Sequence, residues 1–355
     1  MADVAAVRDR FGAQAPALIE TTLLRRRAAT KLPGAQDWLF TDEALQQATA
    51  TPVARHRAQR LAGHVVHDAT CSIGTELAVL ADVTAELVGS DIDPVRLAMA
   101  QHNLGGTALL CRADALQPIT GDAVVVVDPA RRSGGARRFD PKAYTPGLDR
   151  VLQVYRDRNL VVKCAPGIDF AALADLGFTG EIEVTSLAGS VREACLWSPG
   201  LVQAGVRRRA TVLDTGEQLT DADPDDCRAG TVGRWIVDPD GAVVRAGLVR
   251  QYATRHHLWQ LDPDIAYLTG DALPAGVRGF EVLDQLPFTE KKLRQALSQL
   301  DCGALEILVR GVGVDPDELR RRLRPRGGQS LSVVITRIGT GRASRASAFV
   351  CRPSW

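Results

Sequence analysis

The turn Asp68–Thr75 is the first place in the sequence where residue types and spacing could do chemistry. It reads Asp-Ala-Thr-Cys-Ser-Ile-Gly-Thr, with the strand-like run Val65–His67 before it and a helical pattern after it. Small side chains in a strand–turn–helix unit let main-chain N–H groups and the helix N-terminus face a ligand. The turn therefore predicts a cofactor contact through Asp68, Thr70, Cys71, Gly74 and Thr75.

Carboxylates follow the next two predicted strands. Asp91 ends the run that begins at Glu86, where an acid can accept hydrogen bonds from both hydroxyls of a ribose. Asp93 either assists it or caps the helix that starts at Pro94. After the third strand, Asp114 is placed to accept a hydrogen bond from an adenine amine. One such acid alone is more readily a helix cap, but acids in order at successive strand ends favour a cofactor site, with contacts from Asp91, Ile92, Asp114 and Ala115.

The sequence Asp128-Pro129-Ala130-Arg131 follows the fourth strand. An acid there could orient a nitrogen nucleophile or accept its proton. Although Asp-Pro is also a routine turn, its place in the sheet favours a catalytic role for Asp128, Pro129 and Arg131. Arg131 also opens a basic loop, suited to phosphate contacts, with Arg132, Arg137 and Arg138.

Two other kinds of chemistry are disfavoured. Cys164, after the fifth strand, could attack a pyrimidine ring, but no base partner is visible, so a buried thiol is the preferred interpretation. The histidines have no zinc-type spacing, and we predict no metal site; they are His56, His64, His67, His102, His256 and His257.

The elements that position these residues alternate between strand and helix. Short apolar runs alternate with helical patterns from His64 to Val162, which predicts a parallel sheet in an α/β, Rossmann-like fold. Val124–Val127 is apolar throughout and fits a central strand. Residues 1–60 are predicted to be helical, with Thr41 as a helix cap.

These motifs together resemble class I S-adenosylmethionine-dependent methyltransferases that modify RNA, over residues 61–215. The resemblance implies S-adenosylmethionine as the cofactor and a target base above Asp128-Pro129. It also implies that the β-like runs at 181–185, 192–197 and 207–213 supply the antiparallel hairpin that closes the sheet. Two departures stand out: Thr70 and Ser72 replace glycines of the usual turn, and Arg131 replaces an aromatic residue, which leaves the target atom open.

The C-terminal part has a different pattern. Residues 216–284 form a β-rich connecting region, in which 215–228 is predicted to be a loop, and Trp235–Val237 and Val243–Val244 to be a hairpin. Residues 285–355 form an α+β domain that resembles the THUMP-like domain found behind such methyltransferases, and THUMP domains bind RNA. The arginines from Arg320 to Arg326 are either part of such an interface or a solvated helix end.

Composition agrees with a soluble multidomain protein. The 355 residues are 45% hydrophobic and 24% charged, and the net charge of +1 hides local arginine clusters that suit a polyanion. Seven scattered cysteines suit a reducing compartment. No signal peptide or membrane-spanning run is present, so a cytoplasmic location without membrane attachment is expected.

The sequence thus predicts a methyltransferase that modifies a base in tRNA or rRNA. One alternative is a non-catalytic RNA-binding protein that retains the fold, and another is a methyltransferase acting on a protein or small molecule. A nicotinamide-dependent dehydrogenase is disfavoured because no G-x-G-x-x-G turn is present.

Overall fold

The chain forms two compact units, Met1–Arg207 and Arg208–Trp355. The structure, a computed structural model, describes residues 2–130, 132–133, 136–137, 141–339, 341 and 344–355. Each unit buries hydrophobic clusters of its own. Arg131 and Arg138 of the predicted basic loop lie outside the described residues.

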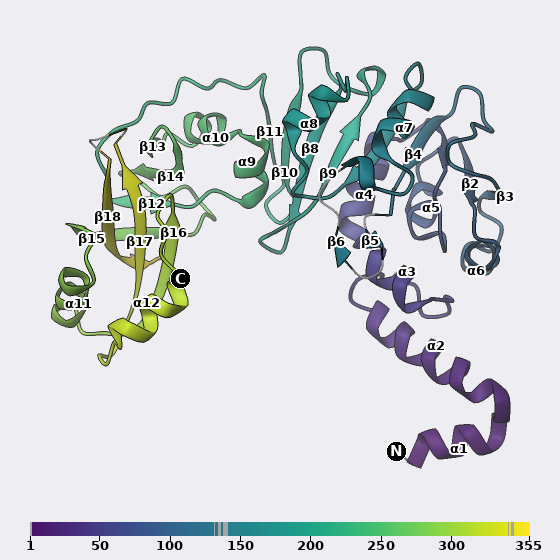
Figure 1. The fold of residues 1–355 in the computed structure, drawn as a ribbon, viewed down its shortest axis with the longest axis horizontal. Helices are drawn as coiled ribbons and strands as arrows, with labels where there is room; N and C mark the ends of the chain where they lie inside the picture. Colours follow the sequence, from purple (N-terminus) through teal and green to yellow (C-terminus); the bar gives the residue numbers. More distant parts are fainter. Residues whose placement is uncertain (1, 131, 134–135, 138–140, 340, 342–343) are drawn as a thin grey trace. The chain divides into compact units, whose positions relative to one another are not determined.

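The first unit is built on a mixed sheet in which the strands have the order β8-β9-β7-β4-β1-β2-β3. Figure 1 labels β8, β9, β4, β2 and β3 of this sheet. The strands from β7 to β3 in this order are parallel, whereas β9 runs antiparallel to both of its neighbours. The predicted α/β fold and its closing hairpin are therefore confirmed. The strands are β1 Val65–Asp68, β2 Glu86–Asp91, β3 Leu109–Arg112, β4 Val124–Val127, β7 Leu160–Cys164, β8 Glu181–Leu187 and β9 Ser190–Trp197.

Local signals explain how this sheet and its helices are bounded. Every residue of β4 is buried, as expected for a central strand. Helix α6 begins at Pro94 behind a capping Asp93 and ends at Gly105, whose φ of 58° suits glycine. Helix α6 covers Pro94–Leu104. The other elements of the first unit after β1 are α5 Thr75–Leu80, β5 Arg132–Ser133, β6 Ala136–Arg137, η2 Pro141–Ala143, α7 Leu148–Val154, α8 Phe170–Asp175 and η3 Pro199–Leu201.

The N-terminal segment is helical, as predicted, and is coloured purple in Figure 1. Thr41 accepts a hydrogen bond from the Ala44 N–H at 3.1 Å, so it is the predicted cap. Leu24, Ala28 and Phe40 form a cluster with Ile73 of the cofactor turn, so this segment supports the turn from behind. Its elements are α1 Ala2–Phe11, η1 Gly12–Gln14, α2 Ala15–Ala28, α3 Asp42–Gln47 and α4 Thr51–Arg60.

The second unit contains a seven-stranded sheet of order β13-β14-β12-β15-β18-β17-β16. Strands β16 and β17 are parallel, and the other neighbouring pairs are antiparallel. The elements are β10 Arg208–Val212, β11 Glu217–Thr220, β12 Trp235–Val237, α9 Gly241–Ala246, α10 Val249–Arg255, β13 Trp259–Asp262, β14 Ile265–Gly270, β15 Gly279–Pro287, α11 Glu290–Gln299, β16 Cys302–Arg310, α12 Pro316–Leu323, β17 Gln329–Ile338 and β18 Arg345–Pro353.

Two local predictions in this unit are wrong. Val243–Val244 lies in helix α9 rather than in a hairpin strand, because Asp240 accepts a hydrogen bond from the Ala242 N–H at 2.7 Å and caps a helix there. Strand β12 pairs with β14 and β15 instead. Strand β11 lies inside the segment 215–228 that was expected to be a loop, and it pairs with β10.

Neither a membrane-spanning helix nor a metal-binding cluster is present among the described residues. No helix among these residues is long and apolar enough to cross a membrane. Within the same residues, no three His, Cys, Asp or Glu side chains come together in a way that could hold a metal ion.

Candidate cofactor and substrate site

The turn between β1 and α5 is held in a tight conformation by its own backbone. Ser72 has a φ of 51° and Gly74 a φ of 87°, so two positions are left-handed. The Cys71 N–H donates to the Ser90 carbonyl at 2.9 Å, which ties the turn to β2. The Cys71 side chain is buried in the core, and burial raises the pKa of its thiol. The Cys71 thiol is therefore not suited to react with a ligand, and the Cys71 main chain serves to hold the shape of the turn.

Asp91 fastens this turn to the end of β2. Its Oδ2 accepts from the Ser72 N–H and its Oδ1 from the Asp93 N–H, both at 2.9 Å. Each carboxylate oxygen can accept more than one hydrogen bond, so Asp91 retains capacity for a ligand. Asp93 is the helix cap, because its Oδ1 accepts from the Val95 N–H at 2.8 Å.

The predicted adenine side lies beyond Asp91. Ile92 is 64% exposed, which is unusual for a large apolar residue and provides a surface for a flat ring. Asp114 is also exposed, and its Oδ1 accepts from the Leu116 N–H at 2.9 Å. Ala115 is buried, with its carbonyl accepting from Tyr155 at 2.7 Å. The Ala113 N–H donates to the Asp91 carbonyl at 3.2 Å, so these two strand ends are adjacent.

Thr70 connects the cofactor turn to the Asp128-Pro129 motif. Its hydroxyl accepts from the Asp128 N–H at 2.7 Å, across 58 residues of sequence. A glycine at position 70 could not make this bond. The residue that departs from the usual glycine-rich turn therefore links the two predicted halves of the site.

The Asp128 side chain is held by a lysine that sequence reasoning did not select. Lys163 Nζ donates to Asp128 Oδ2 at 2.5 Å, and no residue within the described ranges donates to Oδ1. The side chain is 28% exposed, so Oδ1 can reach a substrate. Pro129 is buried behind it, and Ala130 pairs with Thr145 through hydrogen bonds of 2.8 and 3.0 Å. The third predicted catalytic residue, Arg131, is outside the described residues.

Lys163 belongs to a buried charge network. Arg57 donates to both oxygens of Glu76 at 2.7 Å and also pairs with Glu193, while Lys163 lies 3.7 Å from Glu76. Burial opposes the charge on Lys163, but Asp128 and Glu76 outweigh it and raise its pKa. Lys163 is therefore an ammonium group at neutral pH and cannot act as a base.

Asp68 lies beside this network, and it forms no ion pair with any of the residues that the structure describes. Its side chain is 3% exposed, and its Oδ1 accepts from the Thr70 N–H at 3.0 Å. Burial and the neighbouring Glu76 raise the pKa of Asp68 to about 7. Among the described residues, the four carboxylates Asp68, Asp128, Glu76 and Glu193 interact with two buried cations, Arg57 and Lys163, so carboxylates outnumber cations here. A cationic ligand would correct this imbalance.

One feature of the sequence could have revealed Lys163 and its buried partners. Lys163 is a charged residue in the strand Leu160–Cys164, which is buried at every position, and a buried charge requires a partner. Cys164 in the same strand is completely buried within the hydrophobic core. This placement favours the buried-thiol interpretation over a covalent role.

The strand order, with its antiparallel final hairpin, defines the class I methyltransferase fold. An acid-bearing turn after β1, an acid after β2 and an Asp-Pro after β4 all lie at the carboxyl edge of its parallel strands, where open α/β sheets bind ligands.

Comparisons with known proteins agree with this assignment of the fold. Two uncharacterised S-adenosylmethionine-dependent methyltransferases from strains of Mycobacterium tuberculosis are each 68% identical to it over 357 residues, covering 98% of this chain and 100% of theirs. The solved structure of a protein from Porphyromonas gingivalis W83, assigned as a methyltransferase, matches with a TM-score of 0.78 at 19% identity, over 96% of this chain and 91% of that one. Residues 277–353 match the family described as THUMP domain-like.

The chain belongs to the S-adenosylmethionine-dependent methyltransferases. The predictions of an enzyme, of this cofactor and of a THUMP-like C-terminal domain are thereby confirmed. The buried site also fits the cofactor, because S-adenosylmethionine carries an ammonium and a sulfonium group that would offset the carboxylate excess around Asp68.

Proposed function

We propose that this methyltransferase modifies a base nitrogen in RNA, either tRNA or rRNA. The observation that supports an RNA substrate is the THUMP-like match at residues 277–353, because THUMP domains bind RNA. A base within a helix would first have to be extruded to reach the site. A cytoplasmic location is part of the same proposal.

The cofactor is held by the turn and by the strand ends. Asp68 and the main chain from Thr70 to Thr75, with Cys71 and Gly74, contact the methionine part, and Asp91 accepts hydrogen bonds from the ribose hydroxyls. Ile92, Asp114 and Ala115 surround the adenine. When bound, S-adenosylmethionine supplies an electrophilic methyl group.

Asp128 orients the target nitrogen. Its Oδ1 is available to accept a hydrogen bond from the substrate, while Lys163 fixes Oδ2 and Thr70 fixes the main-chain N–H. Because Lys163 holds Oδ2, Asp128 acts mainly by orienting the nitrogen through Oδ1, and this oxygen is placed to accept the proton that the nitrogen releases on methyl transfer. Pro129 shapes the turn, and Arg131 is proposed to contact the RNA.

The test is mass spectrometry of nucleosides from tRNA and rRNA of cells with and without the gene. We expect one methylated nucleoside to disappear and to return when the wild-type gene is restored, but not the Asp128→Ala form. As a control, this variant must bind S-adenosylmethionine in calorimetry. If every methylated nucleoside persists, the RNA proposal is wrong and a protein or small-molecule substrate replaces it. Failure of the wild type to bind S-adenosylmethionine would instead support a non-catalytic role.

A further inference from the structure

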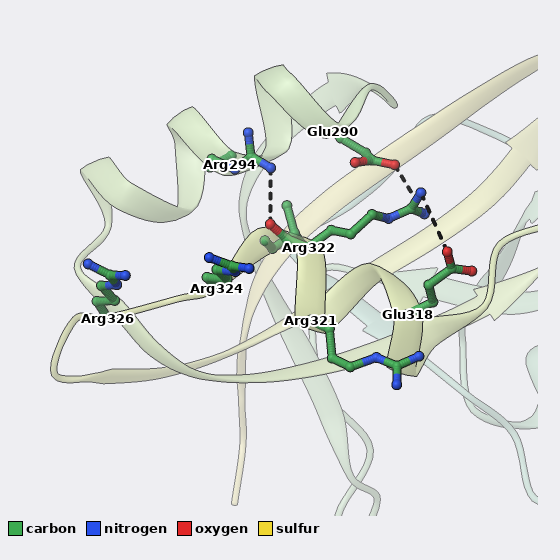
Figure 2. A pocket seen from close by; sticks show the side chains of 8 residues that line it. Glu290, Arg294, Glu318, Arg321, Arg322, Arg324 and Arg326 are labelled. Atoms are coloured by element: carbon green, nitrogen blue, oxygen red, sulfur yellow. Dashed lines mark hydrogen bonds and ion pairs between the residues drawn. The ribbon is translucent and has the colours of Figure 1, made fainter.

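An open pocket lined mainly by arginines lies in the second unit, between α11 and the segment that leaves α12 (Figure 2). Its volume is about 800 Å³, within the range of ligand-binding clefts. Of the described residues that line it, Leu323 alone is apolar and none is aromatic. The arginine pocket is formed by Glu290, Arg294, Glu318, Arg321, Arg322, Leu323, Arg324 and Arg326.

The arginines of the pocket differ in whether their guanidinium groups already have a partner within the protein. Arg322 pairs with Glu290 at 3.1 Å and with Glu318 at 3.8 Å. Arg294 donates to the Arg322 carbonyl at 3.0 Å, as Figure 2 shows. In the described part of the chain, Arg321, Arg324 and Arg326 have no carboxylate partner, and all three are exposed. These three guanidinium groups are available to an anion.

The backbone that carries Arg324 and Arg326 is held on both sides. The Arg324 N–H donates to the Arg320 carbonyl at 3.2 Å, and the Gly327 N–H donates to the Cys302 carbonyl at 2.7 Å. An arginine on a fixed backbone loses less conformational freedom on binding than one on a mobile loop. The pocket is therefore preorganised.

Arg324 occupies a position where the helix would be more stable with glycine. It is the C-cap of α12, with a φ of 49° in the left-handed region. Helices commonly end there with glycine because other residues meet steric strain. An arginine at this strained position points to a role for its side chain that the helix itself does not require.

We propose that the arginine pocket binds backbone phosphates of the RNA substrate, a proposal that rests on the proposed function. Arginine recognises phosphate through paired N–H donors, and aromatic side chains for stacking bases are missing from the pocket lining. The contact is therefore with the backbone, independent of base sequence, and it adds to the salt dependence of RNA binding.

The test measures fluorescence anisotropy of a labelled oligouridine of about 20 nucleotides, longer than the site sizes usual for single strands. The full-length protein is compared with an Arg321→Gln/Arg324→Gln variant and with an Arg250→Gln/Arg337→Gln control of equal charge. Neither control residue lines the pocket. We expect the pocket variant to bind about tenfold or more weakly, with a shallower salt slope, and the control to bind within about twofold of wild type.

An Arg324→Gly variant separates binding from folding. Relief of the left-handed strain should raise its melting temperature by roughly 2 °C, while RNA binding weakens by roughly threefold or more. A higher melting temperature together with weaker RNA binding cannot come from a damaged fold. Unchanged RNA binding in this variant contradicts the proposal.

The remaining outcomes distinguish the two proposals. If wild type binds the oligouridine and the pocket variant binds equally well, the pocket proposal fails and the proposed function stands. If wild type binds neither the oligouridine nor total tRNA, both fail. Competition by polyglutamate as effective as that by unlabelled RNA would show a general polyanion site and would overturn the assignment to RNA phosphates.

Discussion

Replacing Lys163 with methionine removes a cation that two carboxylates share, and we expect a large loss of stability. Lys163 Nζ lies 2.5 Å from Asp128 Oδ2 and 3.7 Å from Glu76 Oε2. At an effective dielectric constant of about 20, these separations correspond to attractions of roughly 7 and 4 kcal/mol. Desolvation of the buried ions offsets much of this attraction, so breaking the network should cost about 3–5 kcal/mol at neutral pH.

The loss of stability in the Lys163→Met variant should depend on pH. Burial alone would raise the pKa of Glu76, but Arg57 and Lys163 outweigh it and hold the pKa below its ordinary value of 4.5. A lowered carboxyl pKa contributes stability that is present above that ordinary value and disappears as the pH falls through the lowered pKa. Without Lys163, the pKa of Glu76 rises, and protonation of this carboxylate relieves the unpaired charge as the pH falls. The difference from wild type should therefore be larger at about pH 8 than at about pH 5.

Urea-induced unfolding at these two pH values, followed by tryptophan fluorescence, measures the loss of stability and its dependence on pH. Lys292→Met is the matched control, because Lys292 is exposed and forms no ion pair with any residue that the structure describes. Its loss should be small and nearly equal at both pH values. A Lys163→Met loss below about 1 kcal/mol, or one that does not change with pH, would refute the assignment of a buried charge network.

Three further changes test the cofactor turn and its link to the substrate side. Ionised Asp68 should attract the cationic cofactor, and its pKa is about 7, so calorimetry should show S-adenosylmethionine affinity rising roughly tenfold from about pH 6 to pH 8, whereas Asp68→Asn should show no such rise. Asp91→Ala should weaken cofactor binding by at least about tenfold while the circular dichroism spectrum is retained; normal binding would contradict the ribose assignment. Thr70→Gly leaves the Asp128 N–H without its acceptor and should lower stability by about 1–2 kcal/mol and turnover more than cofactor affinity. Thr70→Ser keeps the hydroxyl and should retain activity, so equal losses in both Thr70 variants would rule out this hydrogen bond as the cause.

Local patterns were sufficient for much of the fold. Helix α6 carries its own start and stop signals in Asp93, Pro94 and Gly105, and the structure places the helix at the predicted residues. The all-apolar run Val124–Val127 could be assigned to a central strand because only a strand covered on both faces buries every side chain. These features depend on residues close together in the sequence.

Features that depend on pairing between distant segments were not predictable in the same way. The charge network joins Arg57, Glu76, Lys163 and Glu193, which come from separate elements and meet only once the sheet forms. The Asp-Pro-Asp-Gly sequence at 238–241 suits both a hairpin turn and a helix start. Tertiary pairing of β12 with β14 and β15 left the following residues free to form α9.

The position of Arg57 has a practical consequence for anyone who shortens this protein. Arg57 lies on α4, before the first strand, yet it neutralises Glu76 and Glu193 in the interior of the first unit. On the same helix, Arg60 reaches Glu181 at 2.7 Å. A fragment that starts at the first strand would lack the counter-ions of its own interior. A shortened protein that contains the first unit alone therefore has to begin before Thr51.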